Sequence, residues 1–381
     1  MPGTMNILLL NHARAGDFRG GDAVQIQHTA HWLQRFGHRV VVQQSDAPDC
    51  AGFDLVHVFN CRHAEAFAGQ VAAARAAGAA VVVSPIWIPL GEALWGSRTA
   101  MSLLDQAMKD PSKAEASLEL FRQRTIQLKL GDQLYVYPHG HGDLQLGNRR
   151  IGAVLQQVDG VLPNSWLELQ SVRRDLYWHG GLFGVAPYGV DPAPYLNADP
   201  EPFRRWSGIQ GPFVLQAGRV EAAKNPAMLL WALRDTGLPV VLAGNTQLWP
   251  EYVDLCRAIG GDRLRLVEHL PQELLASAYA AASCHALPSW CETCGLVSLE
   301  AALTGTPVVG STVGHEVDYL QGDAWLADPA DPAAIRQAVE QAMAAGRDSE
   351  RPRRLRQRVL EQFNWLRTAE ATEALYQRVL P

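Results

Sequence analysis

Short apolar runs alternate with helix-length segments in the first half of this chain. Segments 23–37 and 64–78 carry apolar residues on one helical face, and each ends at a glycine. Strands that alternate with helices predict βαβ units in a parallel sheet with right-handed crossovers. The runs that read as buried parallel strands are 5–10, 39–44, 54–59, 79–86, 159–165 and 182–189.

The same pattern restarts in the second half, with predicted helices at 225–237 and 296–305. We therefore predict an α/β protein with two Rossmann-like parallel-sheet domains facing each other across a cleft. A length of 381 residues also fits two domains better than one core. The second set of predicted strands is 212–219, 239–245, 263–270, 284–289, 306–311 and 324–328.

A proline-rich stretch at 188–206 reads as the linker between the two domains. We place the N-terminal domain at 1–190 and the C-terminal domain at 191–363. The amphipathic segment 364–381 is expected to pack back on the first domain.

The composition narrows the class of protein. Hydrophobic residues make up 48% and charged residues 19%, and the formal net charge is −6, so nucleic acid is not the expected partner. No apolar run reaches the ~18 residues that a membrane span needs. The N-terminus has neither a basic start nor a long apolar stretch, and six cysteines are too few for a disulfide framework. We expect a cytoplasmic protein with reduced thiols.

Open α/β sheets bind ligands at the carboxyl ends of their strands, so residues just after the predicted strands are the site candidates. Gly20 and Gly21 follow the first strand, where a glycine turn lets a ligand approach the backbone closely. Arg219 and Lys224 follow the first strand of the second domain. An arginine fork and a lysine cation could hold a diphosphate there and stabilise its charge as it leaves.

The stretch CETCGLVSLEAALTGTPVVG, residues 291–310, allows three interpretations. Glu292 lies in the loop between a strand and a helix, and Glu300 lies in that helix. As a sugar-nucleotide clamp, the first carboxylate would accept hydrogen bonds from sugar hydroxyls and the second from ribose hydroxyls. Gly295 and Leu296 would offer backbone amides at the positive end of the helix dipole.

The other two interpretations are a glycosidase carboxylate pair and a metal site. Glycosidase carboxyl groups stand ~5–9.5 Å apart, whereas eight residues of helix would separate the backbones by ~12 Å. A bend in the loop could shorten that distance. Structural zinc takes four ligands, and Cys291 and Cys294 have no second CxxC to complete the set. His285 and Cys284 should point to opposite faces of a strand.

Taken in order, these motifs resemble glycosyltransferase family four, retaining enzymes of the GT-B fold. The resemblance covers nearly the whole chain, and its order and spacing carry it rather than any one motif. The matching stretches are Gly20-Gly21, PNS at 163–165, YGVD at 188–191 where NGVD is commoner, GRVEAAKN at 218–225 and the two glutamates of an E-x(7)-E signature, Glu292 and Glu300.

The resemblance implies that 1–190 is the acceptor-side domain and that 191–363 is the nucleotide-sugar donor-binding domain. It also implies a role for each matching residue. Arg219 and Lys224 would bind the donor diphosphate, and Glu300 would hold the ribose. Glu292 would contact the donor sugar, together with the amides near Cys294, Gly295 and Leu296. Gly20 and Gly21 would approach the phosphates from the other domain. The family implies no metal and no cofactor, and no established protein nucleophile; the acceptor attacks on the face from which the diphosphate leaves.

The chain also departs from the family pattern. Relatives often carry a histidine just after the fourth strand, where this chain has Pro85 and Ile86. His139 and His141 are alternative acceptor-side candidates. Cys294 stands where an aromatic residue is common, which puts the shape of the sugar pocket in question. Segment 87–135 is expected on the acceptor side, as a hydrophobic helix packed in the first domain or as a peripheral contact with the inner membrane face.

The resulting hypothesis is a glycosyltransferase that moves a sugar from a nucleotide diphosphate sugar to a glycan, lipid-linked or small-molecule acceptor. Two alternatives stay open at this stage. One is a GT-B relative with another reaction, such as a phosphorylase or a sugar-nucleotide epimerase. The other is a catalytically inactive protein that binds a nucleotide sugar.

Overall fold

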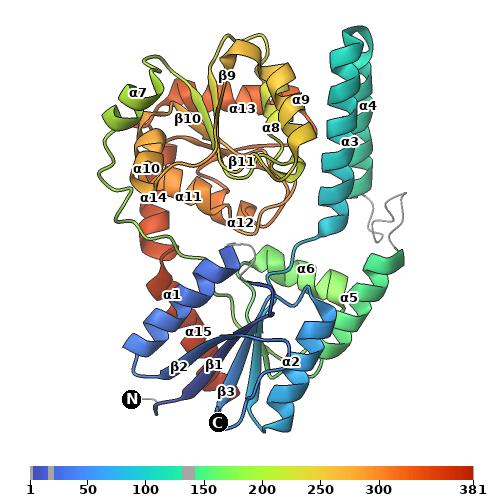
Figure 1. Ribbon diagram of the computed structural model, residues 1–381, viewed down its shortest axis with the longest axis vertical. Helices are drawn as coiled ribbons and strands as arrows, with labels where there is room; N and C mark the ends of the chain where they lie inside the picture. The colour runs from blue at the N-terminus through green and yellow to red at the C-terminus, as the bar shows by residue number, and fades with distance from the viewer. Residues whose placement is uncertain (1–2, 16–20, 131–141, 381) are drawn as a thin grey trace. The chain divides into compact units, whose positions relative to one another are not determined.

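A computed structural model describes residues 3–15, 21–130 and 142–380 (Figure 1). Two compact units divide the chain. Unit 1 comprises Met1–Pro89, Gly140–Asp191 and Gln362–Pro381, and unit 2 comprises Leu90–His139 and Pro192–Glu361, each as far as its residues are described. None of the helices in this part of the chain is both long enough and apolar enough to cross a bilayer.

Unit 1 contains a six-stranded parallel sheet with the strand order β2-β1-β3-β4-β5-β6. All six predicted apolar runs form its strands: β1 (Asn6–Asn11), β2 (Arg39–Gln44), β3 (Leu55–Phe59), β4 (Ala80–Ser84), β5 (Gly160–Val161) and β6 (Leu182–Phe183). Its helices are α1 (Gly21–Arg35), α2 (Ala64–Ala76), α5 (Gly142–Leu155), α6 (Trp166–Leu176) and α15 (Trp365–Val379).

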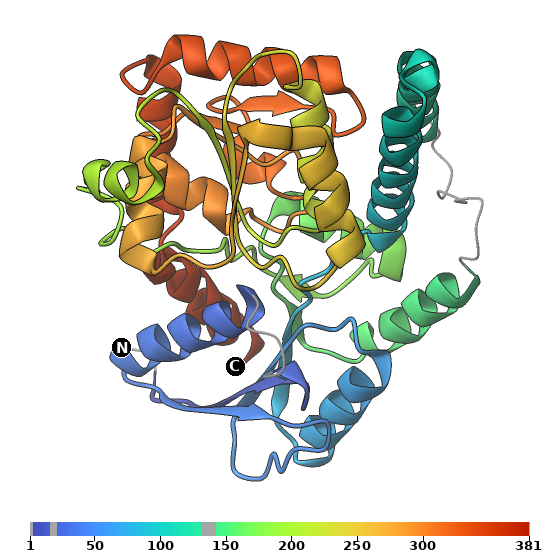
Figure 2. The same cartoon turned by 45° about the horizontal axis from the view of Figure 1, so that its top comes forward.

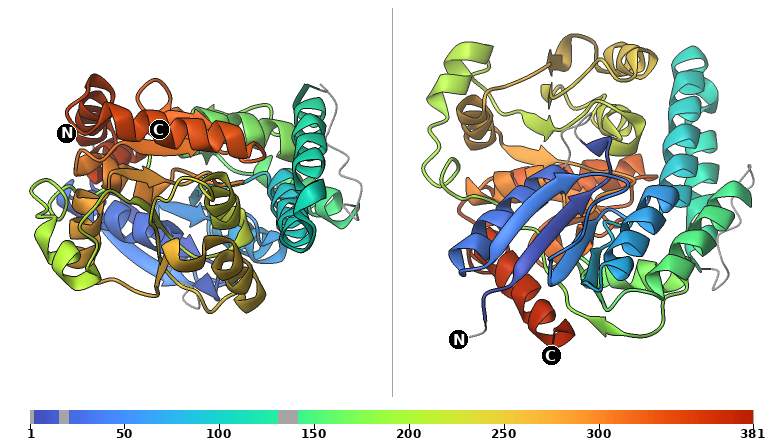
Figure 3. Two further views of the ribbon diagram at one scale, coloured as in Figure 1. Left: turned by 90° about the horizontal axis from the view of Figure 1, so that it is seen from above. Right: turned by 60° about the horizontal axis from the view of Figure 1, so that its bottom comes forward.

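Helices cover both faces of this sheet, as Figure 3 shows. Ile7 and Leu9 of β1 pack with α1 and α15 on one face, whereas Leu8 and Leu10 pack with α2, α5 and α6 on the other. Successive side chains of a strand point to opposite faces, so a strand buried on both sides must be apolar throughout. A hydrogen bond of 2.6 Å between the His57 ring of β3 and the Tyr376 hydroxyl of α15 joins this last helix to the sheet.

Unit 2 contains a second six-stranded parallel sheet, with the order β12-β11-β10-β7-β8-β9. Its strands are β7 (Val214–Ala217), β8 (Val240–Ala243), β9 (Leu264–Val267), β10 (Cys284–Ala286), β11 (Val308–Ser311) and β12 (Trp325–Ala327). Its helices are α3 (Leu90–Lys109), α4 (Pro111–Leu130), α7 (Glu201–Ser207), η2 (Ala222–Lys224), α8 (Pro226–Ala232), α9 (Pro250–Gly260), η3 (Gly261–Arg263), α10 (Gln272–Ala281), α11 (Leu296–Leu303), α12 (Val317–Leu320), α13 (Pro332–Ala345) and α14 (Glu350–Gln362).

The second sheet is also covered on both faces (Figure 2). Helices α8, α9 and α13 share a core with one face, which includes Cys284 and Ala286 of β10. His285 lies between them in sequence and contacts the Tyr279 ring of α10, with ring centroids 5.6 Å apart, on the other face. The predicted opposite orientation of Cys284 and His285 is therefore confirmed.

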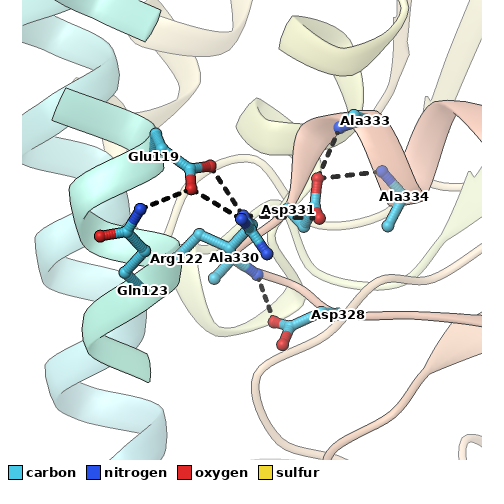
Figure 4. A network of polar contacts seen from close by, with 8 residues as sticks. All are labelled: Glu119, Arg122, Gln123, Asp328, Ala330, Asp331, Ala333 and Ala334. Carbon is cyan, nitrogen blue, oxygen red and sulfur yellow. Dashed lines mark hydrogen bonds and ion pairs between the residues drawn. The ribbon is translucent and has the colours of Figure 1, made fainter. Parts of the chain in front are cut away.

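Helices α3 and α4 form a hairpin that packs on unit 2 (Figure 1). Gly96 of α3 lies so close to Trp290 that a Cβ added to it would be 2.4 Å from the ring. Figure 4 shows a polar anchor, in which Arg122 pairs with Glu119 of its own helix at 2.6 Å and reaches Asp331 at 3.9 Å. Asp331 also caps α13 by accepting hydrogen bonds from the Ala333 and Ala334 amides.

This hairpin corrects the sequence-based division, which placed residues 87–135 in the first domain. Its buried side chains, which include Ala100, Leu104 and Phe121, instead belong to the core of unit 2. Chain order does not determine the surface on which an inserted hairpin packs. The apolar face of the hairpin is complementary to Trp290 and its neighbours, and that match is visible only in the folded chain.

Candidate functional site

The candidate site of unit 2 lies at the topological switch point of its sheet. Strands β7 and β10 are neighbours, but the chain leaves β7 toward β8 and leaves β10 toward β11, on opposite sides. In such sheets the crevice at the carboxyl ends of these two strands is where ligands bind. Lys224 follows β7 and Glu292 follows β10, so the fold brings together two residues 68 positions apart.

Lys224 and Glu292 form an ion pair, with Lys224 Nζ donating to Glu292 Oε1. The two side chains are 18% and 8% exposed, so the pair is largely removed from water. Burial opposes the charge on Lys224, but the Glu292 carboxylate outweighs it and raises the pKa of the lysine. Ser289 Oγ donates a second hydrogen bond to Glu292 Oε1, at 3.0 Å. A fully charged lysine therefore stands at the switch point.

Backbone contacts hold the two sides of this pair in register. Asn225 has a left-handed backbone, with φ of 59°, and its side-chain amide donates to the carbonyls of Pro288 and Pro329 at 3.0 and 2.9 Å. The Trp290 amide donates to the Ala223 carbonyl at 2.8 Å. These bonds join the residues beside Lys224 to the loop that carries Glu292, so the separation of the two charges is set by the backbone.

Arg219 differs from Lys224 in its surroundings. Its side chain is 57% exposed and pairs with Glu221 at 3.0 Å. Its cation is close enough to Lys224 to lower the pKa of the lysine slightly against the effect of Glu292. Both cations therefore lie at the same edge of the sheet, but of these two only Lys224 is buried against a carboxylate.

Glu316 is a residue of this site that the sequence interpretation missed. It is fully buried after β11, and its Oε1 accepts the Ser311 amide at 3.0 Å, while Oε2 has no hydrogen-bond partner in the described chain. Burial, and then the nearby Glu292 carboxylate, raise the pKa of Glu316 well above its ordinary value. The signal was available, because Glu316 also follows a predicted strand.

Gly295 is the residue that precedes helix α11, and it lies against the Glu316 side chain. Its φ is 63°, and a Cβ at this position would be 2.6 Å from Glu316 Oε2. It supplies no side chain to cap the helix, so the first-turn amides, beginning with Leu296, offer donors for an anion. Cys294 is buried beside them, and burial raises the pKa of its thiol well above the ordinary value.

Glu300 lies on α11 with partners of its own. Its Oε2 accepts a hydrogen bond of 3.0 Å from the Tyr279 hydroxyl. Burial raises the pKa of Glu300 to about 7, against the opposing hydrogen bonds from Tyr279 and Tyr195. The two signature glutamates thus have different environments: Glu292 is paired with a cation, and Glu300 with phenolic hydroxyls.

The candidates of unit 1 are less completely described. Gly20, His139 and His141 lie outside the described residues, and Gly21 is the first residue of α1. Ile86, where relatives carry a histidine, has a φ of 49°, which is unusual for a β-branched residue. The buried carboxylate of Glu168 accepts the next amide, that of Trp87, at 2.8 Å.

Unit 1 has its own switch point, between β1 and β3. Asn11 ends β1 and Asn60 follows β3, and both side-chain amides donate to Asp22 Oδ2, at 3.3 and 3.4 Å. Asn60 has a φ of 68°, and its Oδ1 accepts from Arg62 Nε at 3.0 Å. The sequence interpretation gave no role to Asp22 and missed the two asparagines, although both asparagines stand at strand ends.

The metal interpretation of the cysteine pair finds no support in the described chain. All six cysteines are free thiols. Across residues 3–15, 21–130 and 142–380, no group of three or more His, Cys, Asp or Glu side chains is arranged to hold a metal ion.

Residues 211–345 match the family model described as Glycosyl transferases group 1. The matched range begins before β7 and ends with α13, so it includes Lys224, Glu292, Glu300 and Glu316. This region is similar to the group 1 glycosyl transferases. The resemblance inferred from the sequence motifs is thus confirmed for the unit that carries them.

Curated relatives of this chain include D-inositol 3-phosphate glycosyltransferases. The protein of Corynebacterium diphtheriae is 32% identical over 178 residues, which are 42% of this chain and 40% of that protein. The protein of Acidothermus cellulolyticus is 28% identical over 256 residues, 61% of this chain and 57% of that protein. The chain thus matches less than two thirds of the length of either relative.

Solved glycosyltransferase structures share the whole fold. Sucrose-phosphate synthase from Thermosynechococcus elongatus superposes with a TM-score of 0.73 at 17% identity, covering 98% of this chain and 99% of that one. HepE of Anabaena, solved in complex with UDP, gives a TM-score of 0.70 at 15% identity, covering 98% of this chain and 100% of that one. The predicted GT-B fold, with two Rossmann-like parallel-sheet units, is confirmed.

Proposed function

We propose that this protein transfers a sugar from a nucleotide diphosphate sugar to an acceptor hydroxyl, with retention of the anomeric configuration and without a metal ion. The observation that carries the proposal is the buried Lys224–Glu292 pair at the switch point of the unit matched by the group 1 model. The glycosyltransferase names of the relatives, and the UDP in the HepE structure, support a nucleotide-sugar donor.

The chemistry follows from where charge develops. The bond between the anomeric carbon and the diphosphate oxygen breaks, and the electron pair stays on the diphosphate. Lys224, Arg219 and the free amides at the start of α11 would stabilise that charge, because preorganised cations and dipoles act most strongly where water is excluded. The acceptor oxygen then bonds to the anomeric carbon, and its proton passes to the leaving diphosphate or to solvent.

Glu292 has two tasks in this scheme. Without donor, it neutralises Lys224 and keeps the lysine extended into the site. With donor bound, its carboxylate can accept hydrogen bonds from sugar hydroxyls while the lysine turns to the diphosphate. Burial and the Glu292 carboxylate both raise the pKa of the neighbouring Glu316, which disfavours two adjacent carboxylate charges at this point.

The proposal is tested by donor turnover with nucleotide sugars of different bases, with and without candidate saccharide, lipid-linked and small-molecule acceptors. We expect turnover that depends on the acceptor, continues in EDTA and gives a product with the anomeric configuration of the donor, read by NMR. Loss of transfer in EDTA, restored by Mn²⁺, would contradict the metal-free scheme. Turnover that needs only inorganic phosphate would indicate a phosphorylase, and inversion within the nucleotide sugar an epimerase.

A further inference from the structure

A pocket of about 370 Å³ opens at the carboxyl ends of β8 and β9 in unit 2. It adjoins the turn that carries Arg219, because the Gly218 amide donates to the Ala243 carbonyl at 2.8 Å and the Val220 amide to the Asn245 carbonyl at 2.9 Å. The pocket and the two candidate phosphate-binding cations therefore share one edge of the sheet. Its lining residues are Ala243, Gly244, Asn245, Gln247, Glu268, His269, Leu270 and Leu275.

The lining combines apolar walls with one carboxylate. Ala243, Leu270 and Leu275 offer apolar surface suited to the faces of a planar ring. Glu268 is held from one side only: Thr246 Oγ1 and Gln247 Nε2 both donate to its Oε1, at 2.8 and 3.1 Å. These two hydrogen bonds lower the pKa of Glu268, so it is ionised at neutral pH. In the described chain no hydrogen bond reaches its Oε2.

An ionised carboxylate accepts hydrogen bonds and donates none, and this discriminates among nucleobases. Guanine presents two adjacent N–H donors on one edge, at N1 and N2, and the two oxygens of a carboxylate can accept both. Uracil presents a single N–H between two carbonyl oxygens, which a carboxylate repels. Adenine and cytosine each present an amino donor beside a ring nitrogen that is itself an acceptor. Guanine is thus the base that Glu268 fits best.

We propose that this pocket binds the base of the donor and that Glu268 selects guanine, so that the donor is a guanosine diphosphate sugar. The proposal rests on the nucleotide-sugar function proposed above. Asn245 can complete the recognition: its Oδ1 accepts the Gln247 amide at 2.8 Å, so its NH₂ group is the part that can donate to a base acceptor such as guanine O6.

The test is equilibrium binding of nucleoside diphosphates to the full chain by calorimetry. GDP is compared with UDP and ADP, and with inosine diphosphate, which lacks the 2-amino group. We expect GDP to bind most tightly and inosine diphosphate about tenfold more weakly, the loss of about one hydrogen bond to a charged group.

The variant Glu268→Gln turns one carboxylate oxygen into an NH₂ donor. It should weaken GDP binding ~10- to 100-fold and leave UDP binding unchanged. It should also strengthen the binding of xanthosine diphosphate, because the C2 carbonyl of xanthine is repelled by the carboxylate but can accept a hydrogen bond from the NH₂ group of the glutamine. This gain cannot come from a misfolded protein. Glu273→Gln, an exposed change on α10 outside the pocket lining, is the matched control and should alter none of these affinities.

The outcomes separate this inference from the proposed function. If UDP or ADP binds tenfold more tightly than GDP, the guanine assignment is wrong while the nucleotide-sugar function stands. If GDP binds best but Glu268→Gln changes neither GDP nor xanthosine diphosphate affinity, Glu268 is not the selecting residue. If no nucleoside diphosphate binds, the proposed function itself fails.

Discussion

The two units place different chemistry at the same position of their sheets. At the switch point of unit 2, a lysine and a glutamate are buried as an ion pair beside a second buried carboxyl group, that of Glu316. At the switch point of unit 1, two asparagine amides share one oxygen of Asp22, and Arg62 is bonded to an amide oxygen. The first arrangement suits a ligand whose negative charge grows during a reaction, and the second suits neutral hydroxyl groups.

This difference assigns separate tasks to the two edges. A nucleotide diphosphate needs cations and helix-terminal amides, which the edge of unit 2 supplies. A sugar or polyol acceptor needs donors and acceptors in alternation, which the amides and the carboxylate at the edge of unit 1 supply. Substitutions at the two edges should then fail in different measurements, and the predictions below are arranged from the largest expected effect to the smallest.

Lys224→Ala should cause the largest loss. It removes the buried cation that would stabilise the leaving diphosphate, and single electrostatic stabilisers of this kind contribute about 10²- to 10³-fold to turnover. Arg219→Ala should cost only about tenfold, because Arg219 is 57% exposed and already paired with Glu221. The measurement is donor-dependent transfer kinetics, with the exposed Lys109→Ala as control. Equal losses for Lys224 and Arg219 would show that burial does not distinguish them.

Glu292→Gln and Glu300→Gln should separate turnover from nucleotide affinity within unit 2. Glu292→Gln should lower turnover about 10- to 100-fold and leave nucleoside diphosphate affinity unchanged, because it would contact the sugar. Glu300→Gln should weaken donor and nucleoside diphosphate alike, about tenfold, because ribose binding is common to ground and transition states. Calorimetry on both variants, beside transfer kinetics, measures the split. A matching fall in nucleotide affinity in both would contradict it.

Asp22→Asn provides the comparison from unit 1. Two amides donate to Asp22 Oδ2, and replacing one carboxylate oxygen by NH₂ disrupts that arrangement. We expect the acceptor Michaelis constant to rise about tenfold, the equivalent of one disrupted hydrogen-bonded group. Nucleoside diphosphate affinity and slow donor hydrolysis should stay at wild-type values. A loss of nucleotide affinity in this variant would mean that the two edges do not have separate ligands.

The sheets and the strand-end residues were predictable because both follow from short-range patterns. A run buried on both faces, such as Leu55–Phe59, is apolar throughout, and a polar residue after it is conspicuous. The same rule could have found Asn60 and Glu316, which stand after predicted strands but match no family motif quoted above. The Lys224–Glu292 pair was predicted only as two members of one site, because their bond depends on Asn225 and Trp290 holding two distant loops together.

The α3–α4 hairpin was not predictable by the same route. Its apolar stripe shows that it packs on something, and sequence position suggested the first domain. Its partner is Trp290 of the loop that carries Glu292, nearly 200 positions from Gly96 by the chain numbering. A contact over that separation leaves no local pattern, since the small residue and the large ring are complementary only in space.

The smallest predicted effect concerns the ionisation of Glu300. Burial raises its pKa from an ordinary value of 4.5 to about 7, so the folded chain holds a proton between these pH values that the unfolded chain has released. The stability that this proton contributes is fully present below pH 4.5 and is lost as the pH rises through 7. Glu300→Gln cannot titrate, so the difference in unfolding free energy between wild type and variant should fall on going from pH 5 to pH 8. We expect a fall of about 1 kcal/mol, less than the full shift implies because the side chain is only partly buried.

Urea unfolding at pH 5, 6, 7 and 8 measures this fall in the difference between the two unfolding free energies. Glu168 of unit 1, whose pKa burial also raises to about 7, is present in both proteins and cancels. Parallel stability curves for the two proteins would show that folding does not raise the pKa of Glu300. The neutral form of this carboxyl group at pH 5 to 7 could then be discarded.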